Sequence, residues 1–412
     1  MYHFFIFLFS LVLKIAAWFN PKIRQWNIQR SKDFNELTSD KNSLHKPLKR
    51  IWFHCASLGE FEQARFVIDS LYHEDRYQVY LSFFSPSGYE IRKNYPRVHR
   101  VFYLPIDQYG KMKQLVESIK PDLYVGVKYE YWWNLFKALN VLQVPKIFIA
   151  LKYDSRPYFM KFIFAGWFRR LLQNAVFFTQ DQNTTDLLSL KVPLEKIKTV
   201  GDPRVTSVVH RNSDQKSIHS GILNWVDGKK VIVYGSAYTS CLSAISENLN
   251  DSKSEFLHIL VPHDISEENI VTLKSYCKGK ATIYSEWVVD HHKLEGKILI
   301  IDVIGLLFDL YLIADVVYVG GGFEKNVHNT LEPARLGLPL SFGPKHRGFE
   351  EIDYFLNEGI GIEIHTSNDF NRFLEQAFQP EFRTKVKAGI QKYFDKHADA
   401  GLKISEFIAS QY

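Results

Sequence analysis

Cysteine and methionine are both scarce in this chain, with three of each among 412 residues. Cys55, Cys241 and Cys277 lie far apart, and none belongs to a pair with the spacing of a zinc site. A disulfide framework is therefore not expected, and the scattered thiols favour a reducing compartment. The sequence also has no internal repeat and no low-complexity tract.

Two common nucleotide-binding signatures are missing as well. The glycines at 320–322 do not have the G-x-G-x-x-G order at a first strand, and no P-loop lysine pattern occurs. These absences argue against a dehydrogenase and against an NTPase. The net charge of +6 is a mild excess, compatible with anionic partners without identifying one. We expect no nucleic-acid partner, no metal and no cofactor.

The length of the chain suits two hydrophobic cores rather than one. Short apolar runs alternate with helical stretches, which predicts parallel sheets with crossover helices. We expect an α/β protein of two doubly wound, Rossmann-like domains, 31–202 and 203–412. An anchor helix and the start of a linker would occupy 1–30, and residues 20–48 would form an irregular linker. Strands are expected at 50–56, 78–84, 101–104, 123–127, 146–150, 175–179, 230–234, 257–261, 297–301, 316–319 and 338–341.

The first 19 residues are almost wholly apolar, interrupted by His3 and Lys14. The run is borderline in length for crossing a bilayer, which takes about 20 residues. A signal peptide would carry positive charge before the apolar run and a small-residue cleavage site after it, and neither is evident. We expect a retained membrane anchor with the body on the cytoplasmic side. The alternative is a helix packed on the domain or on a partner. Interfacial and basic residues that suit an anchor are Trp18, Lys22, Arg24, Trp26 and Arg30.

Glu60 is the first candidate for a catalytic group. The segment Ser57-Leu58-Gly59-Glu60 follows an expected strand and opens an expected helix. A carboxylate there is held partly by the helix dipole and, when it points into a cleft, accepts a proton from a hydroxyl nucleophile. The alternative is a first-turn glutamate that only caps its helix.

Two other segments follow strands in the first half. Ser87 and Gly88 lie in a turn whose hydroxyls and backbone N–H groups suit a carboxylate or phosphate, although a serine cap explains the same pattern. Glu130 stands among Tyr129, Tyr131 and Trp132, whose rings suit a sugar face. The alternative for Glu130 is an acidic cap beside core aromatics.

In the second half, Gly321 and Gly322 separate a buried-looking strand from a helix expected to start near Asn329. Glycines after a strand let a ligand approach the backbone, and a helix N-terminus offers N–H groups to an anion. Asn329 and Thr330 can donate to phosphate and Glu332 can accept from ribose hydroxyls, unless the set is only a capping box. Other strand-end candidates are Gly235, Ser236, Pro262 and His263, and Lys345, His346 and Arg347 would add positive charge near a leaving phosphate.

Together the motifs resemble the 3-deoxy-D-manno-octulosonic acid (Kdo) transferases of lipopolysaccharide synthesis, over nearly the whole chain. The matching segments are Ser57-Leu58-Gly59-Glu60, Ser87-Gly88-Tyr89-Glu90, Glu130-Tyr131-Trp132-Trp133-Asn134-Leu135, Val200-Gly201-Asp202, His328-Asn329-Thr330-Leu331-Glu332-Pro333-Ala334 and Gly343-Pro344-Lys345-His346.

The resemblance implies a GT-B glycosyltransferase that moves Kdo, with inversion, from CMP-Kdo to a lipid A precursor (lipid IVA). It would work at the cytoplasmic face of the inner membrane. Glu60 falls on the catalytic base of the family. The donor-side positions are Gly235, Ser236, Pro262, His263, Gly321, Gly322, Asn329, Thr330, Glu332 and Lys345, and the acceptor-side positions are Ser87, Gly88 and Glu130.

The chain departs from the family pattern at three places. Val261-Pro262-His263 stands where the family commonly has Pro-Arg-His, so a donor-side arginine is missing, and Arg204 or Arg347 is a candidate substitute. Lys128-Tyr129-Glu130 and Asn326-Val327-His328-Asn329 stand where Glu-Thr-Glu and Gly-Gly-His-Asn are usual. Two other functions remain open: a GT-B transferase or epimerase using a UDP-sugar, and a membrane-anchored nucleotide-sugar binding protein without turnover.

Overall fold

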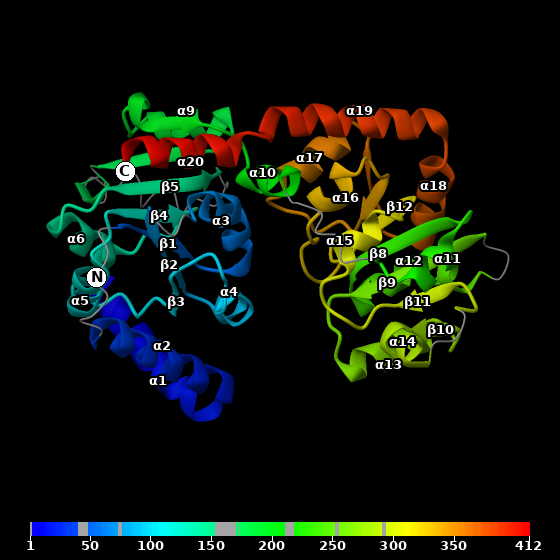
Figure 1. The fold of residues 1–412 in the computed structure, drawn as a ribbon, viewed down its shortest axis with the longest axis horizontal. Helices are drawn as coiled ribbons and strands as arrows, with labels where there is room; N and C mark the ends of the chain where they lie inside the picture. The colour runs from blue at the N-terminus through cyan, green and yellow to red at the C-terminus, as the bar shows by residue number, and fades with distance from the viewer. Residues whose placement is uncertain are drawn as a thin grey trace. The chain divides into compact units, whose positions relative to one another are not determined.

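The computed structural model describes residues 2–39, 48–72, 76–152, 170–172, 174–210, 218–251, 255–290 and 294–412. It divides into two compact units (Figure 1). Unit 1 comprises Met1–Ser207 and His397–Tyr412, and unit 2 comprises Val208–Lys396. Each unit contains a seven-stranded parallel sheet. The prediction of an α/β protein with two doubly wound sheets is confirmed.

The sheet of unit 1 has the order β3-β2-β1-β4-β5-β6-β7. Its strands are β1 (Lys49–Cys55), β2 (Tyr77–Phe83), β3 (Arg100–Tyr103), β4 (Leu123–Val127), β5 (Lys146–Leu151), β6 (Ala175–Thr179) and β7 (Ile197–Thr199). The helices of this sheet are α3 (Leu58–Leu71), α4 (Pro86–Arg92), α5 (Tyr109–Ile119), α6 (Trp133–Val141), α9 (Gln182–Ser189) and, from the C-terminus, α20 (Ala400–Gln411).

Both faces of this sheet are buried, which explains the continuous apolar runs of its strands. Successive residues of β1 enter different cores: Trp52 packs with residues of α5 and α6, whereas Ile51 and Phe53 pack with residues of α3. Helix α20 contributes Ile404 and Ile408 to the second of these cores, one helical turn apart. The C-terminal helix is thus part of unit 1.

The sheet of unit 2 has the order β10-β11-β9-β8-β12-β13-β14. Its strands are β8 (Lys230–Ala237), β9 (Phe256–Pro262), β10 (Ala281–Ile283), β11 (Ile298–Ile300), β12 (Val316–Val319), β13 (Leu340–Phe342) and β14 (Gly361–Glu363). The helices are α11 (Ser220–Val226), α12 (Leu242–Asn250), α13 (Glu267–Tyr276), α14 (Tyr284–Asp290), α15 (Leu307–Tyr311), α16 (Leu331–Arg335), α17 (Glu350–Asn357), α18 (Ser367–Ala377) and α19 (Pro380–His397); α10 (Pro203–Val209) joins the units.

Every expected strand is present, with ends that differ by a few residues. The structure adds β7, β10 and β14, which have three residues each. All three lie at an edge of their sheet. Three residues are too few to show a burial pattern, so the sequence carries little sign of them.

The N-terminal part forms two helices, α1 (Tyr2–Phe19) and α2 (Pro21–Ser39). The expectation of an irregular linker is therefore wrong for residues 21–39, and residues 40–47 lie outside the described part. Asn20 Oδ1 accepts the N–H of Lys22 at 2.9 Å, and Pro21 suits a first helical turn. Asp33 of α2 is buried and accepts the N–H of Tyr103 in β3 at 2.8 Å, which fixes the helix to the sheet.

Candidate functional site

Glu60 and Glu130 follow the two strands of unit 1 between which the strand order reverses. Glu60 lies in the first turn of α3, after β1, and Glu130 lies between β4 and α6. Strands β1 and β4 are neighbours in the sheet. Ligands of doubly wound sheets bind at such a switch point, beyond the carboxyl ends of the strands.

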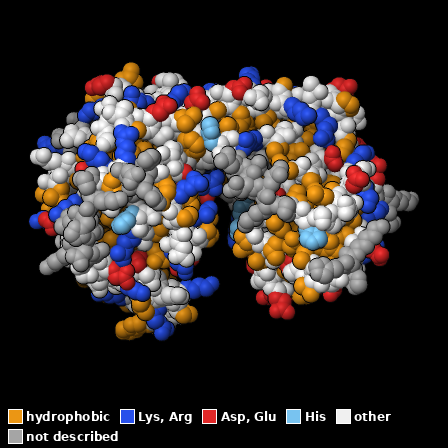
Figure 2. Space-filling model, in the orientation of Figure 1, with side chains coloured by type: hydrophobic (Ala, Val, Ile, Leu, Met, Phe, Trp, Pro, Cys, Tyr) orange, Lys and Arg blue, Asp and Glu red, His pale blue; other side chains and the backbone are white. Residues whose placement is uncertain are grey.

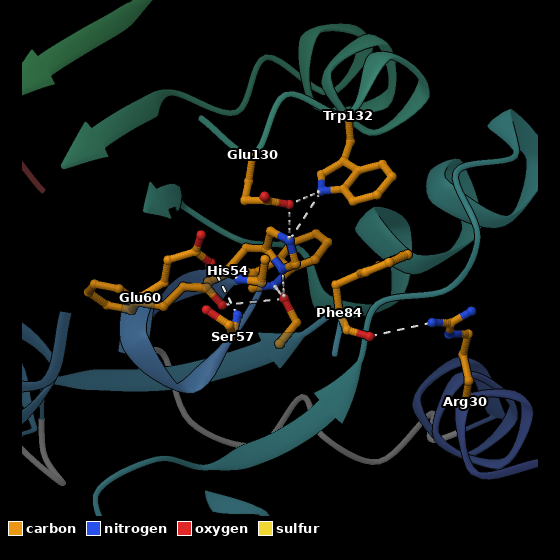
Figure 3. Close-up of polar contacts among 11 residues, drawn as sticks. Arg30, His54, Ser57, Glu60, Phe84, Glu130 and Trp132 are labelled. Carbon is orange, nitrogen blue, oxygen red and sulfur yellow. Dashed lines mark hydrogen bonds and ion pairs between the residues drawn. The ribbon is translucent and has the colours of Figure 1, made fainter. Parts of the chain in front are cut away.

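The Glu60 carboxylate is held by the chain that leads into its own helix (Figure 3). Its Oε2 accepts the N–H groups of Ala56 and Ser57, the latter at 3.1 Å, and Ser57 completes a capping box. Burial, followed by the charge of Glu130, raises the pKa of Glu60 to about 7, although Lys128 and the two N–H groups act in the opposite direction. The residue is thus a helix cap and also a carboxylate that titrates near neutrality, which suits a general base.

A polar network lies beside Glu60 and involves a histidine that the sequence did not single out. His54 is fully buried in β1, and its Nδ1 lies 2.9 Å from Ser82 Oγ in β2. The indole N–H of Trp132 donates to His54 Nε2 at 3.2 Å and to Glu130 Oε2 at 3.1 Å (Figure 3). Because Nε2 accepts from Trp132, the neutral ring carries its proton on Nδ1 and donates it to Ser82. The only sign in the sequence is a histidine that directly follows the apolar residues Ile51, Trp52 and Phe53 of the strand.

Gly88 and Ser87 lie at the start of α4. A Cβ on Gly88 would lie 2.3 Å from the ring of Phe83 and 3.1 Å from the backbone nitrogen of Leu58. The packing of α4 against β2 and α3 therefore accounts for this glycine. Ser87 is exposed, and its hydroxyl lies 2.7 Å from that of Ser85, the N-cap of α4. The acceptor-side roles of Ser87, Gly88 and Glu130 stay predictions.

Arg204, a candidate for the missing donor-side arginine, already has a partner within unit 1. Its Nε and Nη2 donate to Asp202 Oδ2 at 2.9 and 2.6 Å. Burial by itself would raise the pKa of Asp202, but the bonds and charge of Arg204 outweigh it and keep the pKa below its usual range. The guanidinium is thus engaged in holding the Asp202 turn.

In unit 2 the strand order reverses between β8 and β12, and the predicted donor-side glycines lie at the ends of these strands. A Cβ on Gly235 would lie 1.9 Å from the hydroxyl of Tyr311. Gly321 and Gly322 have φ of +82° and +85°, and a Cβ there would collide with backbone atoms of Asn326 and Gly343. Close packing thus requires these glycines. Ser236 has φ of +53°, an uncommon conformation for a residue with a side chain that is often found at binding sites.

His263 belongs to a stack of rings at this edge of the sheet. Its ring lies 4.4 Å from that of His328 and 4.8 Å from that of Tyr238, centroid to centroid, and His328 Nε2 lies 3.0 Å from the Tyr238 hydroxyl. Burial, and then His263 and Lys325, lower the pKa of His328 to about 4. Tyr238 and His328 are not among the site residues predicted from the sequence, although both follow strands of this sheet.

Asn329, Thr330 and Glu332 lie at the start of α16. Asn329 Oδ1 accepts the N–H of Leu331 at 3.1 Å, so this side chain caps the helix. Thr330 is fully buried, and its hydroxyl has no hydrogen-bond partner among the described residues. Burial raises the pKa of Tyr311, and the negative charge of Glu332 nearby raises it further. Lys345 is exposed, and its backbone N–H donates to Gly322 O at 2.7 Å.

Within the described part of the chain, no group of three or more His, Cys, Asp or Glu side chains is arranged to hold a metal ion. All three cysteines are buried and free.

Comparison with known proteins gives consistent results. Residues 28–207 match the family model described as 3-deoxy-D-manno-octulosonic-acid transferase (kdotransferase). The chain is 27% identical to the 3-deoxy-D-manno-octulosonic acid transferase of Aquifex aeolicus, over 84% of this chain and 91% of that protein. It is 26% identical to a bifunctional glycosyltransferase/methyltransferase of Fusobacterium nucleatum, over 89% of this chain but only 58% of that longer relative.

Among solved structures, UDP-GlcNAc 2-epimerase from Neisseria meningitidis is similar in fold, with a TM-score of 0.59. The match covers 88% of this chain and 100% of the epimerase at 13% identity, so it concerns the architecture alone. Two parallel doubly wound sheets of this kind are the GT-B architecture. The family model over residues 28–207 and the curated relatives, such as the Aquifex aeolicus enzyme at 27% identity, all point to the Kdo transferases, which are glycosyltransferases.

Proposed function

We propose that the protein transfers Kdo from CMP-Kdo to a lipid A precursor, lipid IVA, with inversion at the anomeric carbon. The observation that carries the proposal is the Glu60 carboxylate at the switch point of unit 1, with a pKa of about 7, in a chain whose residues 28–207 match the Kdo transferase family model. A carboxylate that titrates near neutrality is both available and basic enough to take a proton at physiological pH.

In this mechanism Glu60 accepts the proton of a hydroxyl on the acceptor sugar. The hydroxyl oxygen forms a bond to the anomeric carbon of Kdo while the bond from that carbon to the phosphate oxygen of CMP breaks on the opposite face. Glu130, fixed by Trp132, keeps negative charge near Glu60 and so makes it a stronger base. Ser87 and Gly88 would contribute to the acceptor side.

The donor would lie at the β8–β12 switch point of unit 2. The left-handed backbone at Ser236 and the unpartnered Thr330 hydroxyl are the features that support a ligand there. Gly235, Gly321 and Gly322 keep this backbone compact, and Pro262, His263, Asn329, Glu332 and Lys345 complete the proposed donor side. Negative charge that develops on the departing phosphate would be stabilised by hydroxyl, N–H and lysine donors.

We also propose that α1 attaches the protein to the cytoplasmic face of the inner membrane, where an amphiphilic acceptor resides. Helix α1 is the one described helix long and apolar enough to cross a membrane. In the sequence, the aromatic and basic residues of a further segment suit either a lipid-facing patch or the core and solvent faces of one helix: Phe159, Lys161, Phe162, Trp167, Arg169 and Arg170. Of these, the described residues include Arg170 alone, which is exposed.

The test is a transfer assay with purified protein, CMP-Kdo and lipid IVA, with mass spectrometry of the lipid product. We expect the wild type to add Kdo to the lipid and to release CMP. When UDP-GlcNAc is offered as donor instead, we expect neither transfer nor epimerisation of its sugar. Epimerisation or transfer of the UDP-sugar would favour the second enzyme class. CMP-Kdo binding without turnover would favour the non-catalytic protein.

A further inference from the structure

Helix α1 has a burial pattern unlike that of a core helix. Ile6 and Ala17 are its two buried apolar residues, whereas Trp18 and Phe19 are 79% and 82% exposed. Large apolar side chains are exposed along its whole length, at Phe4, Phe5, Phe7, Leu8, Leu11, Val12 and Ile15. A contiguous apolar surface of this kind is unfavourable in water and marks a contact with lipid or with another protein.

The first half of α1 is nevertheless attached to the rest of unit 1. At its start, the Tyr2 hydroxyl donates to Asp107, a buried carboxylate that also accepts the N–H groups of Asn134 and Leu135 at 2.9 Å each. In the middle, the ring of Phe9 stacks on that of Phe84 with centroids 6.5 Å apart. A helix that crossed a bilayer would have to leave these contacts, because its two ends would then lie on opposite sides.

Helix α2 fixes the second half of α1. Asn27 Nδ2 donates to Leu13 O and Arg24 Nε donates to Ala17 O, both at 3.2 Å, so α1 and α2 form a hairpin. Helix α2 is in turn fixed by Arg30, whose guanidinium donates to Phe84 O at 3.4 Å (Figure 3). The same guanidinium lies 3.7 Å from the ring centre of Trp26. Eighteen residues of α-helix are also only about 27 Å long, slightly less than a bilayer core.

Between the two helices lies a groove of about 1090 Å³ with an apolar and a basic part. Trp18 and Ile28 supply the apolar part, and Lys14, Arg24 and Lys32 supply the charge. Glu36, which also lines the groove, is paired with Lys32 and with Arg100. Figure 2 shows hydrophobic and basic side chains together at the end of unit 1 where Figure 1 places α1 and α2.

The positive charge near the groove is not fully compensated. Burial lowers the pKa of Lys111 in α5, and the charges of Lys14 and Arg30 lower it further. Cations that repel one another beside an exposed apolar face complement one chemistry in particular: phosphate headgroups above acyl chains.

We propose that the α1–α2 hairpin lies in the plane of an anionic bilayer surface, with the exposed face of α1 among the acyl chains and a lipid phosphate in the groove beside Lys14, Arg24 and Lys32. The proposal extends the membrane attachment proposed above and does not depend on the transfer reaction. The occupant of the groove is a phospholipid of the membrane itself.

Depth measurements distinguish an in-plane helix from a spanning one. Phe5, Val12 and Phe19 are exposed and lie seven residues apart, so they project from nearly the same face of α1. Each is changed to cysteine in turn and labelled with an environment-sensitive fluorophore, since the native cysteines are buried. With the full-length protein on vesicles, we expect the same shallow depth at all three positions. A label at the bilayer centre for Val12→Cys, with the other two near opposite surfaces, would overturn the in-plane arrangement.

Flotation with vesicles tests the groove. We expect the wild type to bind vesicles containing 30% phosphatidylglycerol more tightly than vesicles of phosphatidylcholine alone, and added salt to weaken the binding. Lys14→Ser with Lys32→Ser should weaken the binding about 25-fold, at roughly fivefold per lysine. The matched control, Lys113→Ser with Lys392→Ser, changes two exposed lysines outside the groove and should bind as the wild type does.

Three results would contradict the lipid groove. They are equal binding to both vesicle types, equal loss in the control variant, and a stable dimer in sedimentation that α1 substitutions dissociate, which would identify a second copy as the occupant. Transfer to a deacylated, water-soluble acceptor should be the same in the groove variant and the wild type. If no variant transfers Kdo but the flotation pattern holds, the enzymatic proposal fails and the membrane proposal stands.

Discussion

The carboxylate of Glu130 helps to raise the pKa of Glu60, although the two residues follow different strands. Strands β1 and β4 are adjacent, so their carboxyl ends bring these two acids near each other. Trp132, whose indole N–H also reaches His54, fixes Glu130 on one side, and the N–H groups of Ala56 and Ser57 fix Glu60 on the other. The result is a carboxylate of increased basicity in a defined position.

Replacement of the base is the most direct test of the mechanism. Glu60→Gln retains an oxygen that can accept the N–H groups of Ala56 and Ser57, so the start of α3 should persist. Transfer should fall by about 10²–10⁴-fold, and CMP binding, measured by calorimetry, should be unchanged. Glu62→Gln on the same helix removes ion pairs with Arg65 and Arg92 and should retain activity. Wild-type turnover by Glu60→Gln would exclude Glu60 as the base.

The rate should depend on pH through the ionisation of Glu60. A general base acts only when ionised, so kcat should rise with pH, with a midpoint near pH 7. Glu130→Gln removes a neighbouring negative charge, which lowers the pKa of Glu60 and moves this midpoint to lower pH. The measurement is the profile of kcat between pH 5 and pH 9, which separates this effect from any change in KM. A midpoint that stays in place or moves upward would contradict the coupling.

The same pKa has a consequence for stability. The folded-state pKa of Glu60, about 7, lies above the ordinary value of 4.5, so ionisation costs the folded state free energy as the pH rises from 4.5 to 7. Glu60→Gln should therefore be more stable than the wild type above pH 7, by up to about 3 kcal/mol, and the difference should vanish below pH 4. Urea unfolding at a series of pH values measures it. A constant difference at all pH values would show that ionisation of Glu60 is not its source.

The sequence predicted the sheets well because both faces of each sheet are covered. Strands such as β4 and β12 are nearly continuous apolar runs, and their pattern alone identifies them. Helix α2 was not predicted, because polar residues help to attach it to the rest of unit 1. Arg30 and Asp33 are buried, and their partners Phe84 and Tyr103 are distant in sequence and unknown until the chain is folded.

For the candidate site residues, too, the sequence cannot show contacts between residues that are distant along the chain. Glu60 stood out because a glycine and a carboxylate follow a strand, and the structure gives it a raised pKa. His54 did not, because only the folded sheet brings Ser82 and Trp132 to its two nitrogens. The positions of glycines 235, 321 and 322 after strands predict room for a ligand, yet each glycine also avoids a collision within the protein. Spacing along the chain identifies small residues without distinguishing these two reasons.

Thr330 offers a test of ligand binding with little effect on the fold. Its buried hydroxyl has no partner among the described residues, so Thr330→Val should leave the free energy of unfolding unchanged or increase it. If this hydroxyl donates to the phosphate of the donor, the Kd for CMP should rise about tenfold or more. Thr185→Val is the matched control, since that hydroxyl lies 2.6 Å from the Thr199 hydroxyl in unit 1. It should lower stability and leave CMP affinity unchanged. Equal CMP affinity in Thr330→Val would remove Thr330 from the donor side.

Substitutions at Gly235 can distinguish a role in packing from a role in donor binding. A Cβ there would lie 1.9 Å from the hydroxyl of Tyr311, a buried residue of α15, so Gly235→Ala should destabilise unit 2 by about 1–3 kcal/mol. Tyr311→Phe removes the colliding oxygen and should restore part of this loss in the double variant, as measured by urea unfolding. If Gly235 serves packing alone, the double variant should bind CMP as Tyr311→Phe does. If the donor approaches the backbone at this glycine, the added methyl group should keep CMP binding weak even where stability is recovered.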